Sequence, residues 1–300
     1  MEASPKPNFF IVGAPKSGTT ALYCYLRQHP EIFMCKPKEP QFFADDICGD
    51  QRNVTTLSAY LDCFKEARTR VIGEASTCYL GSPIAPGHIR EFCPQARIII
   101  MLRNPIDVMR AQHSEGVVGG SEHIVDFDLA LDSQEPRRYR SGPFKGQKVV
   151  RLGYRDLVIF SPQVKRFVDT FGHSNVHVIV YDEFAKDARL VCKNALAFLG
   201  VSPNYELPVD VVNANRRIRS TIFQDLLRRP PKTIQGLARA FLPRSTRQMA
   251  ATYLNNLNVQ FVPRPVMDRE FRKRLERDYA EDVRQLSRLI DRDLSHWITT

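Results

Sequence analysis

A short stretch near the start of the chain carries the residues of an anion-binding loop. Gly13 and Gly18 bound a turn that contains Lys16, and Thr19 and Thr20 follow the turn directly. Apolar residues in helical spacing come next, so the turn leads into a predicted amphipathic helix. At the start of a helix, free backbone N–H groups and the positive end of the helix dipole attract anions. Together with the lysine ammonium, this stretch is suited to bind a phosphate or a sulfate-like group.

The two glycines have the spacing of the nucleotide-binding P-loop, G-x-x-x-x-G-K-[ST], with one difference. Thr19 stands where that motif has its lysine, and Lys16 lies inside the loop instead. A nucleotide kinase or a GTPase needs its lysine on the β- and γ-phosphates, beside the Ser or Thr that holds Mg²⁺. The displaced lysine argues against this class, which stays open as an alternative together with a non-catalytic nucleotide-binding protein.

The run from Pro15 to Thr20, P-K-S-G-T-T, resembles the 5′-phosphosulfate loop P-K-x-G-T-T of sulfotransferases that use 3′-phosphoadenosine 5′-phosphosulfate. The resemblance implies that this donor and its product, 3′-phosphoadenosine 5′-phosphate, are the nucleotides bound. It implies that Lys16 is catalytic, because its ammonium stabilises or protonates the leaving phosphate oxygen. No metal is expected, since the lysine and the helix dipole take the place that Mg²⁺ has in phosphoryl transfer. The residues implied to hold the 5′-phosphosulfate are Lys16, Ser17, Gly18, Thr19 and Thr20.

A candidate general base follows in a proline-rich loop. The run from Lys38 to Phe43, K-E-P-Q-F-F, resembles the K-E-x-x-F-F segment of glycan-type and many bacterial sulfotransferases. The glutamate of that segment is the general base in those relatives, which implies that Glu39 deprotonates the acceptor. A carboxylate among aromatic side chains and near an anion site is suited to that task. An ordinary surface Lys–Glu pair is the alternative.

Glu74 is a second candidate for the base or for a contact with the acceptor. The run from Gly73 to Leu80, G-E-A-S-T-C-Y-L, is similar to the family segment G-E-x-S/T-P-x-Y-L, although Thr77 stands where proline is usual. We expect a short strand to end at Gly73 and a loop to carry Glu74 to the mouth of the sheet. A cap on the strand end is the alternative role, and the choice between Glu39 and Glu74 stays open.

Arg103 directly follows a long apolar run, which is expected to deliver it to the mouth of the sheet. The run from Arg103 to Asp107, R-N-P-I-D, resembles the R-[ND]-P-x-[DE] start of the family's 3′-phosphate-binding motif. Arginine can hold a phosphate by two parallel N–H bonds. The family's serine eight residues later is Ala111 here, so one hydroxyl donor is missing. Ser114 and His113 are further candidates, and ordinary packing is the alternative role for His113.

A late segment of the chain is rich in basic residues. Residues 212–220, V-N-A-N-R-R-I-R-S, place three arginines in a polar turn that we expect to precede a helix. The segment is similar to the N-x-S-x-x-x-R-S segment of bacterial family members, which implies that Arg219 closes over the 3′-phosphate and the adenosine. Like charges at a helix N-terminus are unfavourable unless an anion joins them. A basic helix start in solvent is the alternative.

The elements that position these residues indicate an α/β fold. Buried strands of a parallel sheet are predicted from continuous apolar runs at 9–12, 96–102 and 176–181. Amphipathic helices are predicted at 154–171 and 189–199. We therefore expect a P-loop-NTPase-like central parallel sheet flanked by helices, with a helical C-terminal extension.

Residues 1–300 are expected to form one sulfotransferase domain, with its core at about 8–220 and a helical part at about 221–300. A solvated outer helix is predicted at 268–290 from its dense opposite charges. Residues 115–150 are expected to be a lid or acceptor-binding loop, or else an irregular solvated connection. The amphipathic segment 230–243 is expected to pack on the core; otherwise it caps an acceptor pocket or touches a membrane surface.

The charge balance favours acidic ligands in general. The chain has 43 Lys and Arg against 33 Asp and Glu, a formal net charge of +10, without a basic stripe or a nucleic-acid motif, so no nucleic-acid partner is expected. Seven cysteines without a C-x-x-C pair predict reduced thiols. No signal peptide or transmembrane segment is apparent, which favours a cytoplasmic enzyme. Its acceptor is expected to be a small molecule, a glycan or a lipid, and the oligomeric state is left open.

Overall fold

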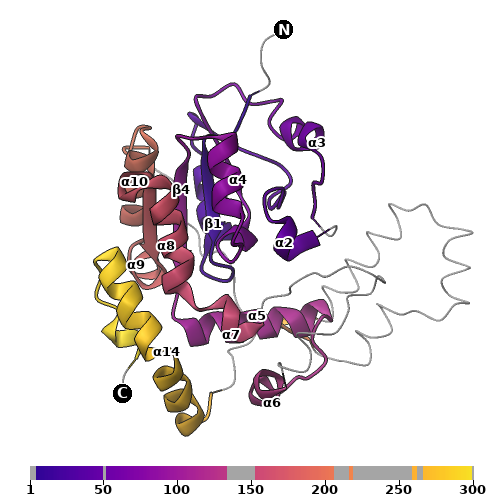
Figure 1. Cartoon of the computed structure of the whole chain (residues 1–300), viewed down its shortest axis with the longest axis vertical. Helices are drawn as coiled ribbons and strands as arrows, with labels where there is room; N and C mark the ends of the chain where they lie inside the picture. The colour runs from indigo at the N-terminus through magenta and orange to yellow at the C-terminus, as the bar shows by residue number, and fades with distance from the viewer. Residues whose placement is uncertain are drawn as a thin grey trace, which may run out of the picture.

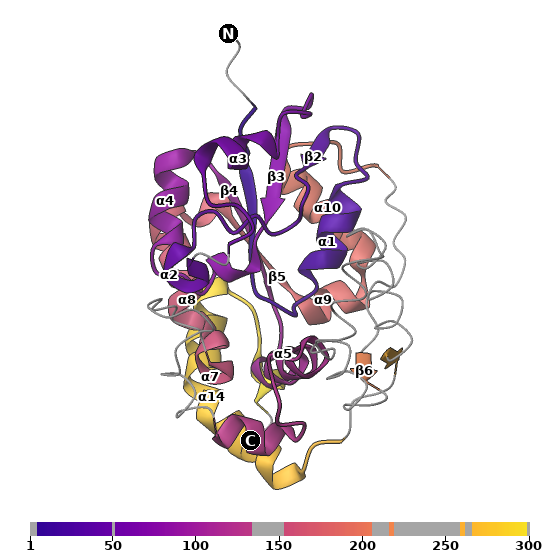
Figure 2. The same cartoon turned by 90° about the vertical axis from the view of Figure 1, so that its right-hand side faces the viewer.

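The computed structural model describes residues 5–49, 52–133, 153–205, 216–218, 259–261 and 266–298. Its centre is a five-stranded parallel sheet in the order β2-β3-β1-β4-β5, with helices on both faces (Figure 1, Figure 2). This arrangement confirms the predicted fold class. The strands are β1 (Phe9–Gly13), β2 (Ile32–Met34), β3 (Val71–Ala75), β4 (Arg97–Leu102) and β5 (Val176–Val180).

Helices connect the strands and cover the sheet. One face is covered by α1 (Thr19–Leu26), α9 (Tyr181–Lys186) and α10 (Ala188–Leu199). The other face is covered by α4 (Ala85–Phe92) and α8 (Phe160–Phe171), and α14 (Arg269–Ile290) packs against α8 on the same side. The remaining helices of the described residues are α2 (Asp45–Cys48), α3 (Leu57–Asp62), α5 (Pro105–Gly119), α6 (Phe127–Asp132) and α7 (Tyr154–Leu157), with short 3-10 turns that include η2 (Thr77–Tyr79) and η5 (Ser295–Trp297).

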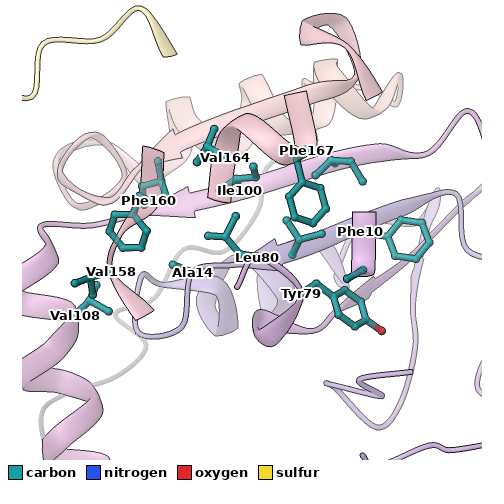
Figure 3. Close-up of a cluster of buried hydrophobic side chains, with 14 of the residues drawn as sticks. Phe10, Ala14, Tyr79, Leu80, Ile100, Val108, Val158, Phe160, Val164 and Phe167 are labelled. Carbon is teal, nitrogen blue, oxygen red and sulfur yellow. The ribbon is translucent and has the colours of Figure 1, made fainter. Parts of the chain in front are cut away.

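The apolar strands supply a core on each face of the sheet. Successive side chains of a strand point to opposite faces, so Phe10 of β1 and Ile100 of β4 belong to the α4–α8–α14 side, whereas Phe9 and Ile99 belong to the α1–α10 side. Figure 3 shows Phe10 and Ile100 in the first of these clusters, together with Phe167 of α8. Burial on both faces explains why β1 and β4 are continuous apolar runs.

The helix predicted at 154–171 is two helices, and this prediction was wrong. Helix α7 ends at Leu157, and α8 begins at Phe160. Pro162 lacks an N–H and its ring conflicts with the carbonyl four residues earlier, so a continuous helix is broken there while the first turn of a new helix tolerates proline. The carboxylate of Asp282 accepts hydrogen bonds from the N–H groups of Phe160 (2.9 Å) and Ser161 (3.1 Å), which satisfies the start of α8.

Three other local predictions need correction. Glu74 lies inside β3 instead of in a loop, because it pairs in register with Phe10 of the neighbouring β1. Glu115 belongs to α5, which continues to Gly119, instead of starting an irregular region. Tyr181 is the first residue of α9 and not the last residue of a strand.

The late basic segment and the C-terminal helix also differ from expectation. Residues Arg216–Ile218 form β6, which pairs antiparallel with β7 (Val259–Phe261) and lies beside α5 (Figure 2). A partner strand distant in sequence overrides the local preference for a turn. Helix α14 is not wholly solvated, since it buries one apolar face against the core.

Some predictions lie outside the described residues: the amphipathic segment 230–243, residues 134–150 of the predicted loop 115–150, and Arg219. That residues 1–300 form one domain stays a prediction. All seven cysteines are unpaired, as expected. Within the part of the chain that the structure describes, no helix is both long enough and apolar enough to cross a membrane.

Candidate active site

The predicted site residues gather where the strands of the sheet end. The turn with Lys16 follows β1, Thr77 follows β3, and Arg103 follows β4. The carboxyl ends of parallel strands lie at one edge of a sheet, where α/β proteins bind ligands. Glu39 reaches the same edge through the loop after β2, because its N–H donates to the carbonyl of Ala75 at the end of β3 (2.9 Å).

The turn after β1 requires both of its glycines. Gly18 has φ 92, and a Cβ built on it would lie 3.2 Å from Met101 Cε and from the ring of Tyr181. A Cβ on Gly13 would lie 2.5 Å from the Cβ of Leu80. Left-handed backbone and close neighbours together exclude other side chains at Gly18. The two glycines thereby allow the turn to pack closely around the start of α1.

The start of α1 offers free donors to an anion. Among the described residues, the backbone N–H groups of Ser17, Gly18, Thr19 and Thr20 have no acceptor. Helix α1 has no acidic residue in its first turn and no side-chain cap. Ser17 and Thr19 are buried and Thr20 is exposed. These unsatisfied donors and the helix dipole fit the 5′-phosphosulfate group implied by the sequence.

Lys16 lies between the turn and α5. Its backbone is left-handed (φ 62), its side chain is 31% exposed, and its ammonium forms an ion pair with the carboxylate of Glu115. Sequence reasoning missed Glu115 because it placed that residue in a loop. A helix continued from Pro105 would have revealed it, since Asp107, Ala111 and Glu115 recur every four residues on one helix face.

Glu39 is held firmly while its carboxylate stays accessible. Its Oε1 lies 2.6 Å from Lys38 Nζ, its Oε2 accepts from Thr77 Oγ1 (3.1 Å), and the side chain is 28% exposed. Its backbone is left-handed (φ 63), as is that of Gln41 (φ 60). Such conformations cost a non-glycine residue about 1 kcal/mol or more and persist where the surroundings enforce them, often at functional sites.

Glu74 is fully buried beneath the loop that carries Glu39. Its carboxylate accepts hydrogen bonds from Tyr60 Oη (3.0 Å) and from Ser76 Oγ (3.0 Å), and Ser76 Oγ in turn accepts from the N–H of Gln41 (3.0 Å). Burial raises the pKa of Glu74 to about 7. These contacts support the loop from below and leave Glu39 as the more accessible of the two carboxylates.

The guanidinium of Arg103 lies against an aromatic ring but has few hydrogen-bond partners. Its Cζ lies 4.3 Å from the ring centroid of Tyr181, and its Nη2 lies 3.5 Å from Asp107 Oδ2. Its buried Nε has no hydrogen-bond partner in the described part of the chain. An unpaired buried donor is costly, and an anion such as a phosphate would satisfy it. Tyr181 was missed by sequence reasoning, because nothing local reveals that β5 delivers it to Arg103.

The remaining candidates divide by their contacts. Ala111 is buried on α5. Ser114 Oγ donates to the carbonyl of Arg110 in its own helix (2.9 Å). His113 is buried, with its Nε2 2.9 Å from the carbonyl oxygen of Ile124 and its ring 5.5 Å from that of Phe127, which are the contacts of a packing residue.

Comparison with known proteins identifies the family of this fold. The sulfotransferase domain family matches residues 6–233 of the chain. A sulfotransferase from Alicyclobacillus acidocaldarius, solved by crystallography, has 30% sequence identity and a TM-score of 0.72, over 98% of this chain and 99% of that one.

Two animal proteins are also similar over part of their length. Bifunctional heparan sulfate N-deacetylase/N-sulfotransferase 1 of Caenorhabditis elegans is 27% identical over 172 residues, which cover 55% of this chain and 20% of that protein. Bifunctional heparan sulfate N-deacetylase/N-sulfotransferase 2 of Homo sapiens is 24% identical over 204 residues, which cover 66% of this chain and 22% of that protein. The chain therefore spans about a fifth of the length of these curated relatives. It belongs to the sulfotransferase domain family.

Proposed function

We propose that this chain transfers a sulfuryl group from 3′-phosphoadenosine 5′-phosphosulfate to a hydroxyl or amine of an acceptor. The observation that carries the proposal is the convergence of three features at one sheet edge. They are the P-K-S-G-T-T turn with its free N–H groups, the accessible carboxylate of Glu39 and the unsatisfied guanidinium of Arg103.

The donor contacts follow from this arrangement. The N–H groups of Gly18 and Thr19, with the side chains of Ser17, Thr19 and Thr20, hold the 5′-phosphosulfate at the start of α1. Arg103 binds the 3′-phosphate, and Tyr181 supports its guanidinium from one side. Arg219, outside the described residues, adds a second positive charge. The donor supplies a sulfuryl group that is already activated by its bond to the 5′-phosphate.

In the transfer step, one residue accepts a proton and another stabilises a developing negative charge. Glu39 accepts the proton of the acceptor hydroxyl while the acceptor oxygen forms its bond to sulfur. The bond from sulfur to the 5′-phosphate oxygen breaks, and Lys16 stabilises the negative charge that develops on that oxygen. To do so, its ammonium turns from Glu115 to the donor. The chain contributes positioning and electrostatic stabilisation, and this scheme needs no metal.

The acceptor belongs to a class of molecules that presents a nucleophilic hydroxyl or amine. Two relatives are named for heparan sulfate N-sulfotransferase activity, which favours an amine or hydroxyl of a carbohydrate. Lipid and natural-product acceptors fit the same chemistry, and a peripheral membrane contact would suit a lipid. The cytoplasmic location expected from the sequence stays a prediction.

Labelled-sulfate transfer tests the proposal. The purified chain is incubated with the labelled donor and a panel of glycans, lipids and extracts of the source organism, and label is expected in an acceptor. A thermal-shift comparison gives the second readout: 3′-phosphoadenosine 5′-phosphate should stabilise the chain, whereas ATP with Mg²⁺ should not. Stabilisation by ATP alone would favour a kinase-like P-loop protein, and nucleotide binding without transfer would favour a non-catalytic protein.

A further inference from the structure

The C-terminal segment reaches the mouth of the sheet through a single buried side chain. Trp297, in η5, is 2% exposed, and its Nε1 donates to Asp182 Oδ2 at 2.6 Å. Its backbone carbonyl accepts from Asn104 Nδ2 at 3.3 Å. The neighbouring His296 also places Nε2 3.0 Å from Asp182 Oδ2, but from an exposed position. Trp297 thus bridges two residues that are distant in sequence.

Those two residues stand directly beside the two halves of the proposed 3′-phosphate site. Asn104 follows Arg103, and Asp182 follows Tyr181. Strands β4 and β5 pair in register through Leu102 and Val180, so Arg103 and Tyr181 leave adjacent strands near the same level, where the guanidinium lies over the ring. Trp297 therefore joins the two chain segments just where they diverge from the sheet.

Asn104 is held at both ends of its side-chain amide. Its Oδ1 accepts from the N–H of Ile106 (2.9 Å) and caps α5, while its Nδ2 binds Trp297. The capping bond fixes the turn that aims Arg103. The bond to Trp297 joins this turn to the start of α9 through Asp182, so the direction of Arg103 and the place of Tyr181 are set together.

Arg103 depends on this support because its own polar contacts are weak. Its bond to Asp107 is 3.5 Å long, at the outer limit of a hydrogen bond, and its Nε has no partner in the described part of the chain. Long side chains lose rotamer entropy when they are immobilised on binding, so holding them in place beforehand raises affinity. The ring of Tyr181 can do this only while the start of α9 keeps its place.

We propose that Trp297 is a positioning residue of the donor site, which acts on the 3′-phosphate contact of Arg103 through Asn104 and Asp182. This inference rests on the proposed function. The family match ends at residue 233, so the residues it covers do not include Trp297. The C-terminal segment is thereby part of the nucleotide site and not only a cover for the core.

The chain contains one tryptophan, so fluorescence excited selectively at tryptophan, apart from its ten tyrosines, reports on this residue alone. The intact chain is titrated with 3′-phosphoadenosine 5′-phosphate and with adenosine 5′-phosphate, which lacks the 3′-phosphate. We expect the emission to change with the first nucleotide, at the concentrations at which calorimetry detects binding, and to change little with the second. Calorimetric binding of the first nucleotide without any change in emission would contradict the coupling.

Two variants separate positioning from packing. Trp297→Phe keeps an aromatic ring but removes the Nε1 donor, and we expect it to weaken binding of 3′-phosphoadenosine 5′-phosphate by about three- to ten-fold, the effect of one weakened hydrogen bond. Binding of adenosine 5′-phosphate should change less than about twofold. Asp182→Asn, at a half-exposed position, removes the acceptor's charge and should act in the same direction even if Trp297→Phe folds poorly.

Arg292→Ala is the matched control in the same C-terminal segment, because its exposed side chain forms its ion pair with Glu183 (3.5 Å), whereas Trp297 bonds to Asn104 and Asp182. It should leave both affinities unchanged. Equal losses for the two nucleotides in Trp297→Phe, or undiminished preference for the 3′-phosphate in both variants, would overturn this inference alone. If the unmodified chain does not prefer the nucleotide with a 3′-phosphate, the assignment of Arg103 fails, and both proposals fall with it.

Discussion

Lys16 has a strained, left-handed backbone, and its ammonium already forms an ion pair. Its left-handed φ of 62 aims the side chain across the turn, where it pairs with Glu115. The pair is partly exposed, so it contributes little to stability, and the donor's own negative charges can replace the carboxylate. The resting partner of Lys16 therefore keeps the ammonium oriented without binding it tightly.

Lys16→Ala is expected to lower the rate of sulfuryl transfer by about a hundredfold or more, the scale of losing one oxyanion-stabilising donor. Labelled-sulfate transfer measures it. Lys165→Ala is a matched control, since Lys165 is an exposed lysine that pairs with Asp169 on α8 (2.7 Å). Transfer by Lys16→Ala at the rate of this control would remove Lys16 from the mechanism.

Glu39 and Glu74 make different predictions because only Glu39 is accessible. Glu39→Gln keeps the shape of the side chain but cannot accept a proton, so turnover should fall by at least about a hundredfold while affinity for 3′-phosphoadenosine 5′-phosphate stays nearly unchanged. Single-turnover kinetics and calorimetry measure the two quantities. An active Glu39→Gln together with an inactive Glu74→Gln would exchange the roles of the two residues.

Substitution of Glu74 should instead change how the free energy of unfolding depends on pH. Burial raises its pKa to about 7, above the value near 4.3 that a glutamate has in an unfolded chain. The folded chain therefore binds more protons between these two pH values, and the free energy of unfolding falls there as pH rises. Glu74→Gln cannot titrate, so its stability relative to the unmodified chain should improve by roughly 2–3 kcal/mol from pH 4.5 to pH 8. Urea unfolding at both pH values tests this; an equal difference at the two would mean that Glu74 is ionised throughout.

At the scale of elements, α5 carries one face of the proposed nucleotide site. Asp107, Ala111 and Glu115 recur every four residues along it, and Arg103 stands just before its first turn. The hydroxyl of Ser114 is bonded to the carbonyl of Arg110, so it does not replace the serine that the family pattern has at Ala111. The site is therefore expected to bind the 3′-phosphate with one contact fewer.

Ala111→Ser should tighten 3′-phosphoadenosine 5′-phosphate by several-fold or more, because a charge-assisted hydrogen bond contributes roughly 1.5–3 kcal/mol in good geometry. Affinity for adenosine 5′-phosphate should hardly change. Calorimetric titration of both nucleotides provides the measurement, with Ser114→Ala as the control that leaves both affinities unaltered. If Ala111→Ser binds both nucleotides as the unmodified chain does, another group already fills the position.

The elements that sequence reasoning predicted best are those whose signals are local. The strand before Gly13, the helix after Gly18 and the strand before Arg103 all follow from apolar runs and end signals, and each is found. The break before Pro162 was also readable, had the proline been given more weight than the apolar spacing.

What the sequence did not reveal depends on contacts between distant segments. Tyr181 meets Arg103 only because β5 pairs with β4, and the strand at Arg216–Ile218 exists only because Val259–Phe261 pairs with it. Glu115 was missed because residues 115–150 were expected to form a loop, whereas α5 continues to Gly119. Trp297 joins the site from a segment that local patterns describe only as the end of a helical region.

At the scale of the whole molecule, the net charge of +10 attracts anionic nucleotides before any specific contact forms. The charges are spread along the chain, yet the mouth of the sheet adds Lys16, Arg103 and the positive end of α1 at one place. A nucleotide with two phosphate groups carries roughly twice the negative charge of one with a single group. The positive field should therefore raise the affinity for the nucleotide with two phosphates more, and this affinity should fall more when salt screens the field.

Affinity for 3′-phosphoadenosine 5′-phosphate is expected to fall several-fold when salt is raised from 0.1 M to 1 M, while affinity for adenosine 5′-phosphate falls less. The screening length shortens over this range from about 10 Å to about 3 Å, so distant charges cease to contribute and only direct contacts remain. Calorimetric titrations of both nucleotides across the salt series give, for each nucleotide, the slope of affinity against salt concentration. Arg103→Gln should lower the slope for the bisphosphate toward that of the monophosphate, because it removes a charge beside the 3′-phosphate. Equal slopes for both nucleotides in the unmodified chain would show that the second phosphate lies in solvent, away from Arg103.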